Sequence, residues 1–251
     1  MSDSQDSEQS TFRTPIIQQI TPLKETKKYK KVHPNLPQSP FFLGIFCPRQ
    51  CGKSTLISYL LLNDDALGQD YYSTVHIFSP TIEQDDTSRF LLERFDCDTV
   101  YSDAKLQKII DKQKQFKKSE MPLICIVLDD AIGDDSMKRN SLLTAFISKA
   151  RHFNADVILS IQSFKSCPKV SRINLTDVMI GYPIPSQAMK QDLIDEFSDN
   201  FEGGEQQWTK LYHEATQKQR FNFMNLKLKN NPITVIRNFS DVISYSENES
   251  I

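Results

Sequence analysis

The spacing of apolar and polar residues along the chain predicts strands that alternate with helices. Short, continuous apolar runs bounded by turn residues indicate buried strands, whereas apolar residues three or four positions apart indicate amphipathic helices. We expect strands at residues 41–46, 74–80, 99–101, 122–130, 155–163 and 177–182, and helices at residues 54–62, 86–95, 103–117, 141–152, 187–197 and 205–216. This alternation is typical of an α/β fold with a mostly parallel central sheet and helices on both faces.

The two ends of the chain differ from this middle part. Residues 1–38 are rich first in polar and acidic residues and then in Lys and Pro, so we expect a disordered or loosely attached tail. Its basic cluster (Lys24, Lys27, Lys28, Lys30 and Lys31) is either a solvated linker, a contact to phosphate groups or a nuclear-import signal. Residues 221–228 and 233–236 predict a C-terminal β-hairpin. We therefore expect one domain at residues 39–240 and a frayed tail at 241–251.

Composition narrows the class of protein only moderately. The chain has 251 residues, enough for one large α/β domain, and its net charge of −2 does not by itself indicate a nucleic-acid binder. The five cysteines are scattered and odd in number, which favours reduced thiols in an intracellular protein over a disulfide framework. We find no signal peptide and no apolar run of about 18 residues, so we expect no membrane span.

The clearest motif follows the first predicted strand. The segment Cys47-Pro48-Arg49-Gln50-Cys51-Gly52-Lys53-Ser54-Thr55 ends in Gly-Lys-Ser-Thr and leads into a predicted helix, as a phosphate-binding loop requires. In such loops backbone N–H groups hold the phosphates, the Lys reaches the β- and γ-oxygens, and the hydroxyl binds Mg²⁺. Cys47 stands where the pattern has its first Gly. The alternative is an ordinary strand–loop–helix turn.

Polar residues end two later strands. Asp129 and Asp130 close the most apolar strand, and buried carboxylates at such an end require a partner or a metal. In P-loop enzymes the first acid holds Mg²⁺ and the next can activate the attacking water; the alternative is an acidic turn. Gln162 closes the following strand and can hydrogen-bond the γ-phosphate or the water, or cap a turn. Arg151 lies at a helix C-terminus, where the helix dipole alone would favour it.

The order of these features resembles the additional-strand P-loop ATPases (RecA/FtsK-like), and within them the FtsK–HerA superfamily of DNA pumps. The closest resemblance is to the genome-packaging ATPases of large DNA viruses, of the poxvirus type, and of related virophages and Maverick-type elements. It covers roughly residues 40–182. The most specific part is Ala150-Arg151-His152-Phe153-Asn154 running into residues 157–163; residues 47–55, 75–80 and 124–131 also carry it.

The resemblance implies roles for individual residues. Lys53 would contact the β/γ-phosphates of ATP, Ser54 would bind Mg²⁺ and Asp129 would support the metal. Asp130 would orient or deprotonate the attacking water, and Gln162 would sense the γ-phosphate. Arg151 would act as an arginine finger on a neighbouring subunit's site. Two positions depart from the family pattern: Cys47 replaces Gly, and Asp130 stands where many relatives have Glu, so hydrolysis can be slower while nucleotide binding persists.

The resemblance also implies partners. ATP would be hydrolysed at the subunit interfaces of a homo-oligomeric ring, a pentamer or hexamer, that moves double-stranded DNA into a viral capsid inside the infected host cell, in the cytoplasm, virus factory or nucleus, or bound to the virion. Candidate contacts to the DNA backbone are Lys138, Arg139, Lys165, Lys169 and Arg172.

Other functions stay open at this stage. A small-molecule P-loop kinase should carry an Arg-rich lid and a GTPase an N-K-x-D motif, and neither pattern is present. A nucleotide-binding module with weak or no hydrolysis is a third possibility, since Cys47 and Asp130 both depart from the pattern. Oxidation of Cys47 to Cys51 is a further hypothesis, which requires loss of ATP binding under oxidant.

Overall fold

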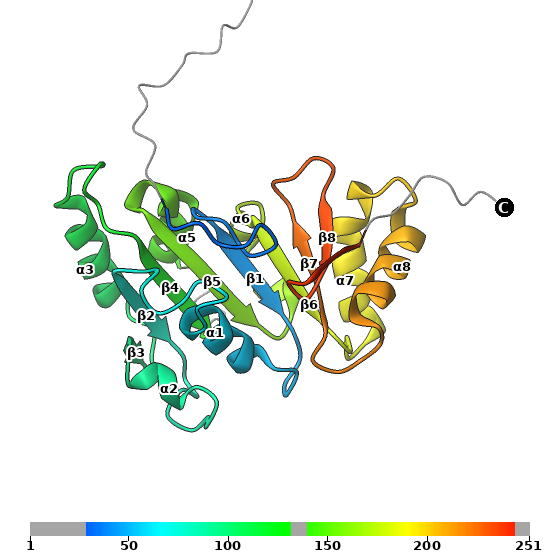
Figure 1. The fold of residues 1–251 in the computed structure, drawn as a ribbon, viewed down its shortest axis with the longest axis horizontal. Coiled ribbons are helices and arrows are strands. Elements are labelled where there is room, and N and C mark those ends of the chain that lie inside the picture. The colour runs from blue at the N-terminus through cyan, green and yellow to red at the C-terminus, as the bar shows by residue number, and fades with distance from the viewer. Residues whose placement is uncertain (1–28, 132–139, 244–251) are drawn as a thin grey trace, which may run out of the picture.

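The computed structural model describes residues 29–131 and 140–243, which form an α/β fold around one sheet (Figure 1). Its strands are β1 (Phe42–Phe46), β2 (Thr74–Phe78), β3 (Asp96–Asp98), β4 (Ile124–Asp129), β5 (Ala155–Ile161), β6 (Asp177–Gly181), β7 (Phe223–Lys227), β8 (Thr234–Arg237) and β9 (Asp241–Ile243). Their order is β3-β2-β4-β5-β1-β6-β7-β8-β9. Pairing is parallel from β3 to β6 and antiparallel from β6 to β9. The predicted, mostly parallel sheet is confirmed.

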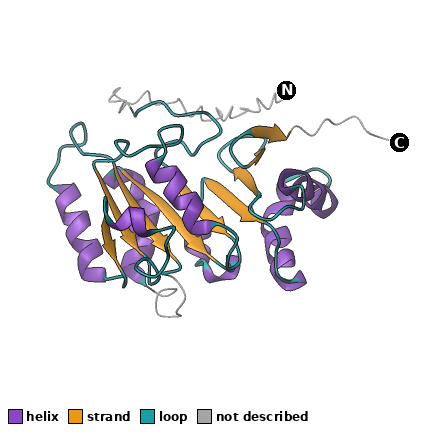
Figure 2. Cartoon of the chain, turned by 60° about the horizontal axis from the view of Figure 1, so that its bottom comes forward, coloured by secondary structure: helices purple, strands orange, loops and turns teal. Residues whose placement is uncertain are grey.

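Helices cover both faces of the sheet (Figure 2). They are α1 (Lys53–Leu62), α2 (Arg89–Leu92), α3 (Asp103–Lys114), α5 (Ser141–Lys149), α6 (Lys169–Arg172), α7 (Gln187–Phe197) and α8 (Gly204–Thr216), with 3₁₀ turns η1 (Ala150–Phe153), η2 (Phe164–Ser166) and η3 (Ser198–Asn200). The sheet has one hydrophobic core on each face, and the side chains of β1 point alternately into one core and the other. Leu43 and Ile45 pack with α1 and α2, whereas Phe42 and Phe46 pack with α3, α5, α7 and α8.

The strand expected at residues 99–101 and the helix expected at residues 86–95 differ most from the sequence prediction. The strand expected at residues 99–101 lies at Asp96–Asp98 instead. Asp96 and Asp98 both pair with Lys105, and Asp96 also contacts His76, whereas the apolar Val100 is 72% exposed. An ion pair to α3 and a hydrogen bond to β2 therefore favour this strand, against the β-propensity of the Thr-Val-Tyr run. The helix expected at residues 86–95 shortens to α2, Arg89–Leu92.

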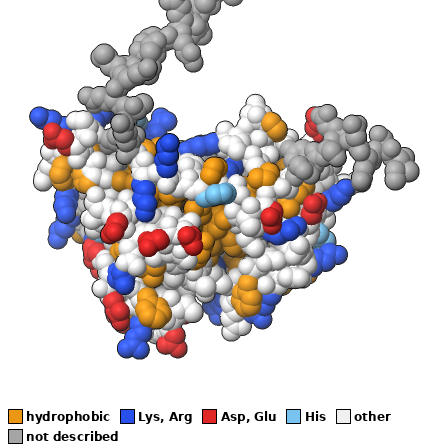
Figure 3. Space-filling model, in the orientation of Figure 1, with side chains coloured by type: hydrophobic (Ala, Val, Ile, Leu, Met, Phe, Trp, Pro, Cys, Tyr) orange, Lys and Arg blue, Asp and Glu red, His pale blue; other side chains and the backbone are white. Residues whose placement is uncertain are grey.

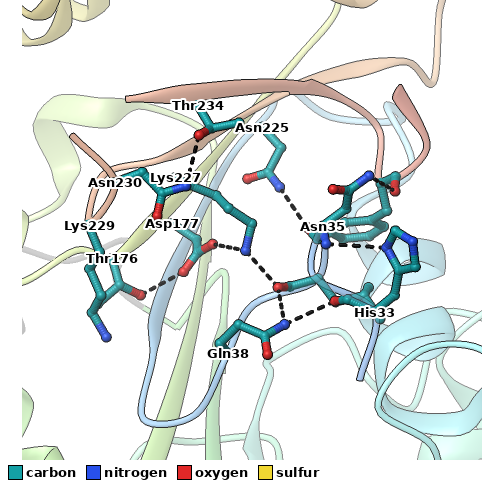
Figure 4. A network of polar contacts seen from close by, with 12 residues as sticks. His33, Asn35, Gln38, Thr176, Asp177, Asn225, Lys227, Lys229, Asn230 and Thr234 are labelled. Atoms are coloured by element: carbon teal, nitrogen blue, oxygen red, sulfur yellow. Dashed lines mark hydrogen bonds and ion pairs between the residues drawn. The ribbon is translucent and has the colours of Figure 1, made fainter. Parts of the chain in front are cut away.

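The ends of the described chain also extend the folded part beyond the expected domain at residues 39–240. Leu36 is buried in the core on the α1 side of the sheet, and Lys227 Nζ donates to its carbonyl at 2.7 Å while lying 3.5 Å from Asp177 (Figure 4). At the other end, β9 continues the sheet to Ile243. Residues 36–38 and 241–243 therefore belong to the fold and not to tails, because a buried lysine and backbone pairing hold them.

No helix in the two described ranges is both long enough and apolar enough to cross a bilayer.

Candidate nucleotide-binding site

The loop between β1 and α1 forms the centre of the site. Strand β1 ends at Phe46 as the sequence predicts, the loop follows, and α1 begins at Lys53, one residue before the predicted start. Gly52 caps the helix at φ 91°, a left-handed conformation that favours glycine, and no side chain caps the helix N-terminus. The N–H groups of the first turn are therefore available to an anion, and the helix dipole favours negative charge there. Arg49 and Gln50 lie exposed at the tip of the loop.

Cys47 and Cys51 are joined by a disulfide across the base of this loop, with their Cα atoms 6.2 Å apart. The expectation that all five cysteines are free thiols is thus wrong for these two; Cys97, Cys125 and Cys167 are free. Both sulfur atoms pack against Gly181 of β6, where a side chain would collide with Cys47 Sγ. The cross-link is possible because the neighbouring strand has no side chain at this position.

Lys53 is 9% exposed and its ammonium group points back along the loop. Nζ lies 3.4 Å from the Cys47 carbonyl and 3.5 Å from the Pro48 carbonyl, and it forms an ion pair with Asp130 Oδ2 at 3.5 Å. A buried cation with three oxygen neighbours requires little movement to exchange one of them for a phosphate oxygen. The geometry therefore suits the predicted contact to the β/γ-phosphates.

Asp129 ends β4 with its carboxyl group buried. The Ser79 hydroxyl donates to Oδ2 at 3.1 Å, while Oδ1 has no hydrogen-bond partner among the described residues. Burial raises the pKa of this carboxyl group. An unpartnered, buried carboxylate oxygen is what a magnesium site offers, because Mg²⁺ prefers carboxylate and hydroxyl oxygens. Asp129 and Ser54 thus fit the metal that the P-loop implies.

Asp130 and Gln162 complete the same edge of the sheet. Asp130 has φ 47°, and its N–H donates to the Ser160 carbonyl at 2.8 Å, which turns its side chain toward Lys53. Gln162 directly follows β5, which lies between β1 and β4, and it lines a small hollow with Cys47 and Pro48. The structure therefore brings Lys53, Asp129, Asp130 and Gln162 to one edge, as predicted.

Asp85 is a carboxylate near the loop that the sequence did not single out. Burial works against its charge, yet hydrogen bonds from Thr87, Ser54 and Ser88 hold its pKa below the ordinary value. A hydroxyl that donates its proton to a carboxylate keeps its lone pairs free for a metal. Asp85 is therefore suited to orient the Ser54 hydroxyl, and only the Asp-Asp-Thr-Ser composition of residues 85–88 hinted at a turn of this kind.

An aromatic cavity opens beside the loop and was also missed by the sequence analysis. It measures about 600 Å³ and extends from Gly52, Lys53 and Thr55 to side chains of α1 and the C-terminal strands. Its aromatic lining residues are Tyr59, Phe221, Phe223 and Phe239. Tyr59 and Phe239 stack with ring centroids 6.4 Å apart. Apolar side chains gather in the middle of this face in Figure 3. Such a cavity next to a phosphate loop suits a planar base.

Arg151 lies far from these residues. It is exposed in η1, before β5 begins, whereas the loop follows the end of β1. Strands β1 and β5 run parallel with Phe42 opposite Val157 and Phe46 opposite Ile161, so the paired residues alone separate the two ends by about 13 Å. Arg151 therefore lies at the opposite edge of the sheet and does not join the site of its own chain.

Two of the five candidate DNA contacts form ion pairs within the chain. Lys165 pairs with Asp192 at 2.5 Å and Arg172 with Glu196 at 2.8 Å, so both are tied to α7. Lys169 is exposed at the start of α6. Lys138 and Arg139 lie outside the described residues.

Known proteins match the chain at the level of a family and of the fold. The family model described as the poxvirus A32 protein matches residues 32–189, more than half of the chain. The DNA-packaging ATPase B204 from Sulfolobus Turreted Icosahedral Virus superposes with a TM-score of 0.57 at 13% identity, over 78% of this chain and 96% of that one. The genome packaging NTPase B204 from Sulfolobus turreted icosahedral virus 2, in complex with ATP-gammaS, gives 0.53 at 12% identity over the same shares. No curated protein sequence matches the chain.

Proposed function

Because the chain belongs to the poxvirus A32 family and is a P-loop ATPase of the FtsK–HerA type, we propose that it is an ATP-driven motor that packages a viral genome. In this proposal the chain forms a homo-oligomeric ring, a pentamer or hexamer, that hydrolyses ATP at its subunit interfaces. The ring moves double-stranded DNA through its centre into a capsid, within the infected host cell or on the assembling virion.

The observation that carries the proposal is the arrangement around Lys53. Its ammonium group is buried and faces the Asp130 carboxylate at 3.5 Å, while the neighbouring Asp129 keeps one buried oxygen without a partner among the described residues. A loop that only binds an anion would need the buried ammonium group of Lys53 but neither carboxylate. The two carboxylates add a metal ligand and a group that can hold an attacking water, which is what hydrolysis requires.

Each residue then has a defined task. Lys53 and the N–H groups after Gly52 hold the phosphates and neutralise the charge that develops on the transferring phosphoryl group. Ser54 and Asp129 would hold Mg²⁺, which would supply positive charge next to the phosphates. Asp130 accepts a proton from the attacking water or orients it, and Gln162 contacts the γ-phosphate from the tip of β5. The aromatic cavity receives the base.

The position of Arg151 supports hydrolysis between subunits. An exposed arginine at the opposite edge of the sheet has no access to its own phosphate loop, but in a ring it can face the loop of the next subunit. An arginine supplied in this way stabilises charge in the transition state and makes turnover depend on assembly.

Two other functions remain as alternatives with specific grounds. Asp130 reaches less far than Glu, and the loop begins with Cys47, so a nucleotide-binding module with little hydrolysis is one of them. A small-molecule P-loop kinase is the other, in which the cavity beside the loop would hold the acceptor in place of the base.

The deciding experiment is ATP turnover measured with and without duplex DNA, with particle size read in parallel. The proposal expects turnover that rises with DNA and a ring-sized particle in the presence of ATP and DNA. Tight ATP binding without turnover under any condition would favour the module. Turnover that ignores DNA but responds to a small acceptor would favour the kinase.

A further inference from the structure

The segment between α8 and β7, residues 217–222, lies over the phosphate-binding loop. It lies outside residues 32–189, which the family model matches, so the family match says nothing about it. Three of its residues, Gln217, Lys218 and Phe221, have φ between 51° and 73°, a region that side-chain-bearing residues rarely adopt. Non-glycine residues in this conformation cost free energy and are retained where the surrounding structure uses them.

Arg220 connects this segment to the tip of the phosphate loop. Its Nε donates to the Gln50 carbonyl at 3.2 Å and its Nη2 donates to the same oxygen at 2.9 Å, across 170 positions of sequence. Gln50 itself has φ 59°. Since the peptide unit is planar and trans, fixing the Gln50 carbonyl also fixes the opposite direction of the Cys51 N–H. Arg220 thereby sets the orientation of an N–H group in the loop that binds phosphates.

Phe221 occupies the other side of the same segment. Its ring lies 3.3 Å from the position that a Cβ on Gly52 would take, and it forms a wall of the aromatic cavity. The ring is nevertheless 62% exposed, and the Arg220 guanidinium lies 5.4 Å from its centroid. A large aromatic ring left this exposed beside an apolar cavity offers a stacking surface for a planar ligand.

We propose that residues 217–222 form a nucleotide clamp, in which Arg220 is a positioning residue for the phosphate loop and Phe221 contacts the base. The proposal rests on the nucleotide-binding function proposed above. It separates two parts of the ligand: Arg220 acts on the phosphate end through Gln50, and Phe221 acts on the base end directly. The guanidinium ion, through its charge and two N–H donors on one oxygen, is the group that lysine cannot replace here.

The test compares binding of ATP and of inorganic tripolyphosphate, which has phosphates but no base, by calorimetry on the full chain with Mg²⁺. For Arg220→Ala we expect both dissociation constants to rise by about tenfold, since charge-assisted hydrogen bonds to the loop are lost. Arg220→Gln retains an N–H donor and should recover part of this. For Phe221→Ala we expect a rise of about five- to tenfold for ATP and no change for tripolyphosphate, because one stacking contact is lost. Lys210→Ala, at an exposed position of α8 outside the segment, is the matched control.

Thermal unfolding of each variant is measured alongside, and unchanged midpoints are expected because Arg220 and Phe221 are exposed. If wild type binds ATP but the Arg220 and Phe221 variants bind it equally well, the clamp is wrong while the proposed function stands. If Phe221→Ala weakens the binding of ATP and of tripolyphosphate to the same extent, Phe221 does not contact the base. If the wild type binds neither ligand, the nucleotide-binding function itself fails.

Discussion

At the residue scale, the buried ammonium group of Lys53 is the feature on which the site depends most. It is held by two loop carbonyls and by Asp130, so its position is set before any ligand arrives. We expect Lys53→Ala to lower ATP turnover by about 100-fold or more, since donors placed at developing charge have effects of this size. Single-turnover hydrolysis measures it. Lys108→Ala, on the exposed side of α3, is the control. Activity like that of the wild type in Lys53→Ala would refute the assignment of the site.

The Cys47–Cys51 cross-link gives a second prediction at this scale. The sulfur atoms lie against Gly181, on the β6 side of the loop. We therefore expect oxidation by hydrogen peroxide to form this disulfide, two thiols and one hydrogen peroxide giving one disulfide and two waters, and to leave ATP binding intact. This expectation is the opposite of the hypothesis drawn from the sequence, in which oxidation abolishes ATP binding.

Peptide mapping by mass spectrometry under non-reducing conditions identifies the pair, and calorimetry follows ATP binding before and after reduction by a thiol. Cys51→Ser should show no cross-link, whereas Cys97→Ser, at a free cysteine, should behave as the wild type. Loss of ATP binding on oxidation, restored by thiol, would contradict this prediction and show that the cross-link blocks the loop.

At the element scale, the start of β5 ties the N-terminal segment to the sheet. Asp156 is fully buried there and accepts hydrogen bonds from Ser39, from the Phe41 N–H at 2.9 Å and from Tyr72 at 3.0 Å. Burial raises its pKa from 3.8 to about 6 against the opposing effect of these donors. The folded protein therefore binds this proton more tightly than the unfolded chain.

It follows that the stabilising effect of this proton is present below about pH 4 and is lost as the pH rises to about 6. We expect Asp156 to lower the free energy of unfolding by on the order of 2–3 kcal/mol over this interval. Asp156→Asn should remove that part of the pH dependence, because the amide retains an acceptor for Phe41 without the charge. Denaturant unfolding between pH 4 and 7 measures it, with exposed Asp86→Asn as control. Equal pH slopes in wild type and Asp156→Asn would contradict the buried-carboxyl account.

The elements themselves show what the sequence can predict. Strand β1, helix α1 and the loop between them were predictable because the apolar run of the strand, the loop motif and the start of the helix follow one another directly in the sequence. The same holds for Asp129 and Gln162, since carboxyl ends of parallel strands meet at one edge. The strand at Asp96–Asp98 was not predictable, because it depends on contacts with His76 and Lys105, which lie in other elements. Nor were Arg220 and Phe221, whose partners Gln50 and Gly52 lie about 170 positions away.

At the scale of the whole molecule, the sheet has two functional edges that face in opposite directions. Lys53 and the carboxylates lie at one edge, and Arg151 lies at the other. In the proposed function, a single chain would therefore carry both halves of a site that it could not close by itself. A net charge of −2 also means that attraction to DNA must come from local groups and not from the chain as a whole. In the proposed function, assembly would therefore be a condition for activity.

Mixing of variant subunits tests this arrangement. Arg151→Ala should bind ATP as the wild type does, since Arg151 is far from its own loop, but should lose turnover by about 10³-fold, the usual effect of an arginine finger. Asp130→Asn should also lose turnover. In a mixed ring, the intact site of an Arg151→Ala subunit can receive Arg151 from an Asp130→Asn neighbour, so partial activity should return when the two inactive proteins are combined. His152→Ala, at the adjacent exposed position, is the control. If the mixture stays inactive although the subunits co-assemble, Arg151 does not act between subunits, and the opposite edge of the sheet has another role.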